Sequence, residues 1–427
     1  MVSKDYESIF YSKMKNRSSW ICCQLGAREH YIIPRALHKA GELVSFITDA
    51  WVLPSSSREY LPPFLKNIRG RFHADLEAIS VKSFTNSLIQ FEITKAIQRI
   101  SGWKLTMARN LWFQKQALAA LDSDLHEKKM LELPQPVFFA YSYAALQLFH
   151  FAKNRGWRTV LGQIDPGPAE EAIVASEYAK QQDYNKYWKP APEEYWKLWM
   201  EECVLADEII VNSEWSRRAL VDSGVNPDKL RVIPLAYTPS TEAKDFIRTY
   251  PTVFTAERPL RVLFLGQVIL RKGIIPLLQA ADILRSEPVE FYLVGPADKM
   301  IEDQIRVRKN IQWHGSVSRD STAEFYKTCD IFVLPTFSDG FAITQLEAKA
   351  WKMPIIASKF CGNVVQDGVT GSILSEINGA TIAETILLYL RDSQKLRDFS
   401  SSCGNSLEFG LETLQNNLSR CAYAPIS

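Results

Sequence analysis

Long apolar runs and net charge are both scarce in this chain of 427 residues. No apolar run reaches 18 residues, and the longest candidate, residues 136–152, is interrupted by Ser142, Gln147 and His150. Because a membrane span needs about 20 apolar residues, we interpret this candidate as a buried strand followed by a helix. The formal net charge of +2 excludes a chain that is basic enough throughout to bind polyanions. A hydrophobic content of 46% excludes a disordered chain and can fill the cores of two or three domains.

Cysteines are few and follow no regular pattern. The seven cysteines are an odd number and include no Cys-x-x-Cys pair, which excludes the disulfide framework of a small secreted protein. The stretch from Met1 to Trp20 is polar and charged, so we expect no secretory signal peptide, reduced thiols and a cytoplasmic location. A Gly-x-Gly-x-x-Gly motif is also missing after the first expected strand of each block described below, which argues against a dinucleotide-dependent dehydrogenase.

Charge is unevenly distributed along the chain. Residues 1–120 contain 17 Lys and Arg against 9 Asp and Glu, a net charge of +8, whereas the remainder contains 33 against 39, a net charge of −6. Such asymmetry is typical of a surface that faces an anionic partner. Chance variation among solvated faces explains it equally well.

The first of two blocks of alternating strands and helices covers about residues 15–235. It begins with a short apolar strand, a helical pattern that stops at Gly41 and a second strand, which is the unit from which parallel sheets are built. Residues 52–115 mix prolines, cations and aromatic residues, and we interpret them as an elaboration of this block. The expected strands are residues 19–24, 43–48, 137–140, 159–161 and 208–211.

The second block follows residues 238–259, whose threonines, prolines and charges predict a linker. Its expected strands are near-continuous apolar runs, which predict a sheet covered by helices on both faces. Two such blocks predict two doubly wound α/β domains. The strands of this block are expected at residues 261–265, 289–294, 311–314, 331–334 and 354–357. At its end, helical spacing predicts an amphipathic helix that carries Leu407, Leu411, Leu414 and Leu418.

A basic turn bounded by two glycines, residues 266–273, lies between the first strand and the first helix of the second block. Gly266 and Gly273 allow the backbone to approach a ligand closely. The start of the following helix offers free N–H groups, and Arg271 and Lys272 add positive charge. Together these features suit a phosphate group, although a solvated basic turn is the simpler interpretation of this segment taken alone.

Two carboxylates mark a second segment, residues 338–347. Asp339 lies in the loop after an expected strand, and Glu347 lies on the helix that follows. Loops at the carboxyl ends of parallel strands are where such sheets bind ligands, and carboxylates accept hydrogen bonds well from the hydroxyls of a sugar or a ribose. The alternative is structural, with Asp339 capping the helix and Glu347 on a solvated face.

Several short segments follow one another in a fixed order along the second block. They are Gly266 with Arg271-Lys272-Gly273, Val294-Gly295, His314 to Val317, Pro335 to Phe341, Leu346 to Ala348, Pro354 to Ser358 and Asp367 to Gly371. With these segments in this order, the block resembles the donor domain of the retaining family-4 (group 1) glycosyltransferases of GT-B fold. The resemblance covers about residues 260–375, is weaker in the 30 or so residues before the linker and is limited to the general plan in the first 200.

The resemblance implies the GT-B fold, in which two Rossmann-like α/β domains face a central cleft and a C-terminal helix crosses back to the first domain. It implies an N-terminal acceptor-binding domain at residues 1–240. A C-terminal domain that binds the nucleotide-sugar donor would follow at residues 258–400, and the returning helix would lie in residues 401–427.

The resemblance also implies roles for individual residues. Lys272 would hold the diphosphate of a nucleotide-sugar, and Gly266 would give it room. Asp339 would face the donor sugar, and Glu347 would face the ribose. Arg271 would add catalytic charge, and further donor contacts would come from Gly26, Gln267, Val317, Gly340, Phe341 and Ala342.

Three positions depart from the family's pattern. Gln267 stands where the family usually has an arginine, which removes one positive charge from the expected leaving-group site. Asp339 stands where a glutamate is usual and is one methylene shorter. The histidine that many members carry in the first domain is replaced by residues 141–143, Tyr-Ser-Tyr, so His30 and His150 are the remaining candidates for a catalytic histidine.

Two further segments contain acidic residues. Residues 122–124 spell the Asp-x-Asp pattern of metal-using glycosyltransferases, but they follow an apparent helix, so we favour a solvated helix end over a metal site. Residues 165–168, Asp-Pro-Gly-Pro, precede Glu170 and Glu171 at the expected cleft. They either contact the acceptor or form a rigid turn.

The function implied by the resemblance is metal-independent, retaining transfer of a hexose-type sugar from a UDP- or GDP-sugar to a hydroxyl of a sugar or lipid-linked acceptor, as in glycan, glycolipid or polysaccharide biosynthesis. No cofactor beyond the nucleotide-sugar co-substrate and no nucleic-acid partner is expected. The alternative is a nucleotide-sugar-binding pseudoenzyme that acts as a sensor or partner. Peripheral contact with an anionic membrane is expected from the first third of the chain, where the cations are accompanied by Trp51, Tyr60, Phe64, Phe72, Trp103 and Trp112.

Overall fold

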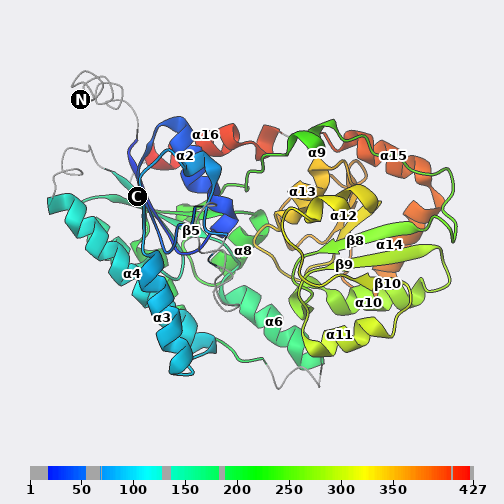
Figure 1. The fold of residues 1–427 in the computed structure, drawn as a ribbon, viewed down its shortest axis with the longest axis horizontal. Helices are drawn as coiled ribbons and strands as arrows, with labels where there is room; N and C mark the ends of the chain where they lie inside the picture. Colours follow the sequence, from blue (N-terminus) through cyan, green and yellow to red (C-terminus); the bar gives the residue numbers. More distant parts are fainter. Residues whose placement is uncertain are drawn as a thin grey trace.

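Two parallel β-sheets form two lobes of the chain in a computed structural model (Figure 1). The structure describes residues 18–53, 68, 70–126, 136–181, 188–404 and 407–423. The first sheet has the order β3-β2-β1-β4-β5-β6-β7 and the second the order β10-β9-β8-β11-β12-β13. In each sheet the strand order reverses beside the first strand, as in doubly wound domains. The α/β architecture with two Rossmann-like domains is therefore confirmed.

The strands are short, and most are buried. In the first sheet they are β1 (Trp20–Gln24), β2 (Leu43–Thr48), β3 (Val81–Ser83), β4 (Val137–Tyr141), β5 (Arg158–Gln163), β6 (Glu208–Val211) and β7 (Leu230–Val232). In the second sheet they are β8 (Leu260–Leu265), β9 (Val289–Val294), β10 (Ile311–Trp313), β11 (Ile331–Leu334), β12 (Ile355–Ala357) and β13 (Gly371–Ile373).

Helices cover both faces of each sheet. Those of the first lobe are α2 (Ile32–Ala40), α3 (Thr85–Ile97), α4 (Gly102–His126), α5 (Leu146–Lys153), α6 (Pro168–Lys180), α7 (Glu193–Leu205) and α8 (Glu214–Asp222). Later in the chain come α9 (Thr241–Asp245), α10 (Ile274–Ile283), α11 (Lys299–Arg306), α12 (Thr322–Thr328), α13 (Thr344–Ala350), α14 (Gly379–Arg391), α15 (Ser393–Ser402) and α16 (Leu411–Tyr423). Three 3-10 turns matter below: η1 (Arg28–Tyr31), η6 (Leu270–Lys272) and η7 (Leu407–Phe409).

The local sequence explains the first strand-helix-strand unit. All five side chains of β1 are buried, and the strand pairs in parallel with β2 on one side and β4 on the other. Helix α2 ends at Gly41, which has a φ of 70°, a left-handed conformation that glycine adopts without strain. The apolar run at residues 136–152 forms β4 and α5, as expected. In the described part of the chain, no helix combines the length and the apolar character that crossing a membrane requires.

The interpretation of residues 52–115 was incomplete. They supply β3, which pairs with β2 at the edge of the first sheet, and two helices, α3 and the start of α4. Residues 54–67 lie outside the described part, and with them Tyr60 and Phe64. The segment predicted as a linker contains α9, and Arg248 in it donates to main-chain carbonyl oxygens of the second lobe, among them that of Trp351 at 3.1 Å from Nε.

The predicted terminal helix begins later than expected. Leu407 lies in the separate turn η7 and is 87% exposed, and α16 begins at Leu411. From there Leu414 and Leu418 are buried, and α16 packs against α2 of the first lobe (Figure 1). The chain therefore crosses back to the first domain, as the GT-B fold requires.

All seven cysteines are buried and unpaired. Burial raises the pKa of these thiols, for example that of Cys361 and Cys329 to about 12. The expectation of reduced thiols is therefore consistent with their environment, because a buried neutral thiol is a poor nucleophile.

Candidate functional site

A cleft of about 400 Å³ lies between the two lobes and is lined by residues of both. Gly266 follows β8 directly, and Arg28 and Glu29 follow β1, so the cleft lies at the carboxyl ends of the strands beside which each sheet reverses its order. Sheets of this kind bind ligands at such positions. Eight residues that the sequence indicated line the cleft: His30, Gly266, Gln267, Arg271, Lys272, Asp339, Phe341 and Ala342.

The basic turn is held in place by its second glycine. Gly273 has a φ of 75°, and a Cβ atom there would overlap the carbonyl oxygen of Pro335, so only glycine fits. The turn η6 precedes Gly273, and α10 begins directly after it at Ile274. The side chain of Lys272 is thereby placed where a helix begins, a position that favours negative charge.

Lys272 and Asp339 form an ion pair in the cleft. Their side chains are only 14% and 15% exposed. Burial, and then the neighbouring Arg271 guanidinium, lowers the pKa of Lys272 to about 7. The Asp339 carboxylate in contact with the amine acts in the opposite direction and favours its charged form. An anionic ligand would also favour the charged form of Lys272, and it would do so more strongly if it carried two negative charges.

Arg271 is directed toward the first lobe. Its Nη1 donates to the main-chain oxygen of Ser338 at 2.6 Å and lies 3.4 Å from Glu170 on α6. Glu170 also accepts a hydrogen bond from the Ser338 hydroxyl at 2.8 Å, and burial raises the pKa of this carboxyl. Arg271 therefore joins the two lobes, and Asp339, 3.9 Å away, competes for the same guanidinium.

The segment after Asp339 is shaped by contact with the first lobe. A Cβ atom on Gly340 would overlap the carbonyl oxygen of Ile164, which follows β5. The Oδ1 atom of Asp339 accepts a hydrogen bond from the Phe341 amide at 3.2 Å. Ala342 has a φ of 64°, and α13 begins only at Thr344. The loop is thus held from both lobes, so a ligand in the cleft meets a fixed wall.

Four expected donor residues lie outside the lining of the cleft: Gly26, Val317, Glu347 and Gly340, whose contact with Ile164 is described above. Glu347, on α13, accepts a hydrogen bond from the Tyr326 hydroxyl at 2.7 Å, and burial raises its pKa. Val317 is half-buried against the apolar core. Gly26 has a φ of 89°, and its amide donates to Asp49 at 3.0 Å, while the guanidinium of Arg71 packs beside it. Their roles toward a donor stay predictions.

The first lobe contributes a strained turn that no sequence motif indicated. Glu29, His30 and Tyr31 all have left-handed backbones, with φ of 50°, 55° and 60°. Each costs about 1 to 2 kcal/mol in a residue other than glycine. Glu29 accepts hydrogen bonds from the Tyr141 hydroxyl and the Asn212 amide, both at 2.7 Å, and burial raises its pKa. Ends of three different strands thus hold one carboxyl at the cleft.

Arg28 also lines the cleft, across from Gln267. Its buried Nε has no hydrogen-bond partner among the residues that the structure describes. An unsatisfied buried donor is costly, so such a group usually marks the place of a ligand or water. The positive charge that Gln267 removes from the second lobe is thereby replaced by a charge from the first. No motif in the sequence indicated Arg28; its position between β1 and α2 is the feature that could have suggested it.

The two candidate histidines differ in position. His30 lines the cleft, and its Nδ1 lies 2.9 Å from the guanidinium of Arg319 in the second lobe. Burial and then Arg319 lower the pKa of His30 to about 4, so its ring is neutral and accepts this hydrogen bond. His150 is exposed on α5 and does not line the cleft. Asp122, of the Asp-x-Asp pattern, is exposed on α4 and lies 3.6 Å from Arg155; the side chain of Asp124 is outside the described part.

Residues 251–403 match the family model described as glycosyl transferases group 1. The second domain is a group 1 glycosyltransferase domain. Among curated relatives, this chain is 26% identical over 245 residues to a D-inositol 3-phosphate glycosyltransferase of Xylanimonas cellulosilytica, spanning 51% of this chain and 58% of that one. It is 30% identical over 139 residues to an N,N'-diacetylbacillosaminyl-diphospho-undecaprenol alpha-1,3-N-acetylgalactosaminyltransferase of Campylobacter jejuni, spanning 32% of this chain and 36% of that one. The chain therefore spans little more than half, or less, of the length of these relatives.

The group 1 domain and the first lobe together match solved structures of GT-B glycosyltransferases. The crystal structure of Anabaena HepE in complex with UDP and glucose has a TM-score of 0.59 at 16% identity, covering 95% of this chain and all of that one. The lipopolysaccharide outer core galactosyltransferase WaaB has a TM-score of 0.55 at 12% identity, covering 95% and 99%. At such identities the likeness shows the fold, so GT-B is the fold of both domains together.

Proposed function

We propose that this protein is a retaining glycosyltransferase that moves a hexose-type sugar from a UDP- or GDP-sugar to a hydroxyl of a sugar or lipid-linked acceptor. The observation that carries the proposal is a buried lysine, Lys272, at the start of a helix in a cleft shared by two domains. The group 1 domain contains that lysine, and HepE, a protein of the same fold, binds UDP and UDP-glucose. UDP is therefore our first choice of nucleotide.

The leaving diphosphate is where this cleft would act. Breaking the bond between the anomeric carbon and the diphosphate oxygen places negative charge on the phosphates. Lys272 and Arg28 would approach those phosphates from opposite domains, and both are partly shielded from water. Charges that are pre-positioned in such an environment stabilise the transition state by about 2 to 4 kcal/mol each. Two cations and a helix start can thus do electrostatically what a metal ion does in other transferases.

Retention of configuration follows if the acceptor attacks from the face that the diphosphate leaves. The bond between the anomeric carbon and the acceptor oxygen then forms as the bond to the phosphate breaks. A leaving phosphate oxygen takes the proton of the acceptor hydroxyl, so no protein base is needed. His30 suits this scheme, because its ring already accepts a hydrogen bond from Arg319.

The paired carboxylates would bind the donor's hydroxyls. Asp339 is in the cleft, and once a diphosphate competes for Lys272 its carboxylate is freed toward the sugar. Glu347 lies eight residues further on, in the first turn of α13, and would reach the ribose after exchanging its bond with Tyr326. Arg271 and Glu170 would hold the domains together around the bound donor.

Incubation with UDP-, GDP- and ADP-sugars, followed by measurement of released nucleotide, tests the proposal. We expect slow hydrolysis of one donor without acceptor, and a loss of at least 30-fold in that rate for Lys272→Ala, equivalent to about 2 kcal/mol. Lys309→Ala, an exposed lysine of the same domain, is the matched control and should retain the rate. Tight donor binding with no release from any donor would instead identify a pseudoenzyme.

Peripheral contact with an anionic membrane stays a prediction. Four aromatic residues that suggested it pack against rings within the first domain. Trp51 packs against Phe72 with centroids 5.3 Å apart, Trp112 against Phe91 at 5.4 Å and Trp103 against Tyr195 at 4.9 Å. Flotation with vesicles that contain anionic lipid, at low salt, would test the contact. Recovery of all protein in the vesicle-free fraction would exclude it.

A further inference from the structure

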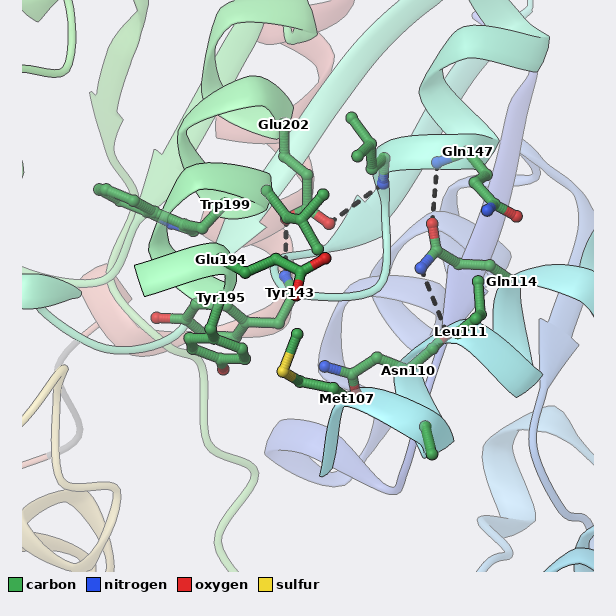
Figure 2. Close-up of a pocket in the computed structure, with 13 residues that line it drawn as sticks. Met107, Asn110, Leu111, Gln114, Tyr143, Gln147, Glu194, Tyr195, Trp199 and Glu202 are labelled. Atoms are coloured by element: carbon green, nitrogen blue, oxygen red, sulfur yellow. Dashed lines mark hydrogen bonds between the residues drawn. The ribbon is translucent and has the colours of Figure 1, made fainter. Parts of the chain in front are cut away.

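A second pocket, of about 340 Å³, lies in the first domain between α4, α5 and α7. Figure 2 shows that Met107 and Asn110 on α4 line one side and Glu194 and Tyr195 on α7 the other. Its volume is within the range of small-molecule sites. None of the residues placed in the donor cleft lines this pocket. It is therefore a separate space within the domain expected to bind the acceptor.

Two polar side chains that line this pocket, Glu202 and Gln114, are hydrogen-bonded to neighbouring main-chain groups. The carboxylate of Glu202 accepts hydrogen bonds from the amides of Tyr143, Ala145 and Leu146, at 2.7, 2.7 and 3.1 Å, and so holds the start of α5 (Figure 2). The side chain of Gln114 accepts a hydrogen bond from the main-chain N–H of Gln147 at 2.8 Å and donates one to the main-chain oxygen of Asn110 on its own helix. These contacts make the pocket a built space with fixed walls.

Three polar side chains at the pocket remain available. The side chains of Asn110, Gln147 and Glu194 have no hydrogen-bond or ion-pair partner within the described part of the chain. They face a wall of aromatic and aliphatic groups that includes Tyr143 and Tyr195, whose rings stack with centroids 5.0 Å apart. The pocket thus combines apolar surface with a few free hydrogen-bonding groups, as ligand sites do.

The lining excludes most classes of ligand. No lysine or arginine is found among the described residues that line the pocket, so a phosphate or uronate would lack a counter-charge and would face Glu194. A hydrocarbon chain would cover the half-buried side chains of Asn110 and Gln147, which costs about 1 to 3 kcal/mol for each one left unpaired. A neutral sugar ring has an apolar C–H face and a rim of hydroxyls, and it satisfies both kinds of surface. We propose that this pocket binds a neutral sugar residue of the acceptor.

The pocket is connected to the donor cleft through one loop. The Tyr143 hydroxyl lies 2.5 Å from the Asp165 carboxylate, which also accepts from the Gly167 amide at the start of α6. Glu170, on α6, lies 3.4 Å from Arg271 of the second domain. A sugar against Tyr143 would therefore be linked, through the hydrogen bond to Asp165, to the loop that Gly340 of the second domain contacts. The role as acceptor subsite rests on the proposed function, whereas sugar binding itself does not.

Ligand-observed saturation-transfer NMR on the full chain tests the proposal. The probes are methyl glucoside, methyl N-acetylglucosaminide and maltotriose, with methyl glucuronide and octanol as charged and apolar comparisons. We expect signals from the neutral sugars alone. Ala108→Trp places a large ring at the pocket and should abolish them, whereas Ala119→Trp, an exposed position on the same helix, should leave them unchanged.

A milder variant guards against misfolding. Gln147→Ala removes one free amide and should weaken binding of the best neutral sugar about fivefold, the equivalent of one hydrogen bond. Binding of octanol or glucuronide that Ala108→Trp removes would overturn the proposal, as would neutral-sugar signals that persist in Ala108→Trp. A parallel titration with UDP-glucose separates the two proposals: donor binding without sugar signals overturns this one alone, and sugar signals without donor binding overturn the proposed function alone.

Discussion

Replacing Arg28 with alanine is the sharpest test of the cleft, because the sequence gives Arg28 no role and the structure gives it one. The change removes a cation whose Nε has no partner among described residues and which lies in the same cleft as Lys272. It leaves the strained turn that follows intact. We expect the variant to fold normally and to bind and turn over a nucleotide-sugar poorly.

The size of the effect follows from the charges that remain. One well-placed donor to a developing negative charge contributes about 2 to 4 kcal/mol. Lys272 stays in place, and the side chain of Arg28 is half-buried and partly shielded by solvent, so the lower end applies. A loss of about 2 kcal/mol corresponds to about a 30-fold fall in kcat/KM. Folding should change little, because the buried Nε of Arg28 has no hydrogen bond to lose within the described part of the chain.

Nucleotide release under single-turnover conditions provides the assay, and a second substitution provides the rescue. Gln267→Arg restores a cation on the other side of the cleft, so the double variant should regain at least tenfold of the lost rate. Arg218→Ala, an exposed arginine on α8, serves as the control. The reasoning is refuted if Arg28→Ala keeps its rate within threefold, or if Gln267→Arg lowers the rate of the double variant further.

Three other outcomes are expected. The amine of Lys272 is partly neutral above about pH 7, so donor binding should be accompanied by uptake of a proton between about pH 7 and pH 9. Calorimetry in buffers of different ionisation enthalpy would detect this proton uptake, and binding heats that do not depend on the buffer would contradict the prediction. The Gly340→Ala substitution places a Cβ atom against the carbonyl oxygen of Ile164, so turnover should fall at least tenfold. Thermal unfolding should show a free energy of unfolding lower by about 1 to 3 kcal/mol. A fully active variant would mean that activity does not need the two domains to approach each other at Gly340 and Ile164. The Glu347→Gln substitution keeps a hydrogen-bond partner for Tyr326 but removes the negative charge, so the donor KM should rise about tenfold with a smaller change in kcat. Steady-state kinetics would show an equal fall in kcat if Glu347 does not bind the ribose.

The sequence predicted the second domain better than the first because the second uses short-range patterns. Gly273, for example, has a φ of 75° between the turn η6 and the start of α10, and a glycine at such a position is a local signal of a tight turn before a helix. The apolar strands around it are buried on both faces, so their residue types are equally constrained. Lys272 and Asp339, which the sequence singled out in two separate segments, line one cleft, and their direct ion pair was not predicted.

The first domain could not be derived in the same way, because its site depends on long-range contacts. Glu29 is held by Tyr141 and Asn212, which are 112 and 183 residues away in the chain. No local pattern encodes such a pairing. Similarly, helical spacing alone extended the last helix back to an exposed Leu407, whereas the turn η7 pairs with Tyr237 and α16 begins only at Leu411. Tertiary contact decided each of these positions.

The seven buried thiols can report on the local opening of the protein. They are distributed over both domains, and Cys421 lies on the helix that joins them. A thiol reagent can react only when a segment opens, so the labelling rate at each cysteine measures the free energy of opening of its own surroundings. Modification at Cys421 would report separation of α16 from the first domain, whereas Cys361, next to the cleft residue Phe341, would report opening of the donor side. Mass spectrometry of the labelled native chain could therefore follow domain closure on donor binding without any engineered probe.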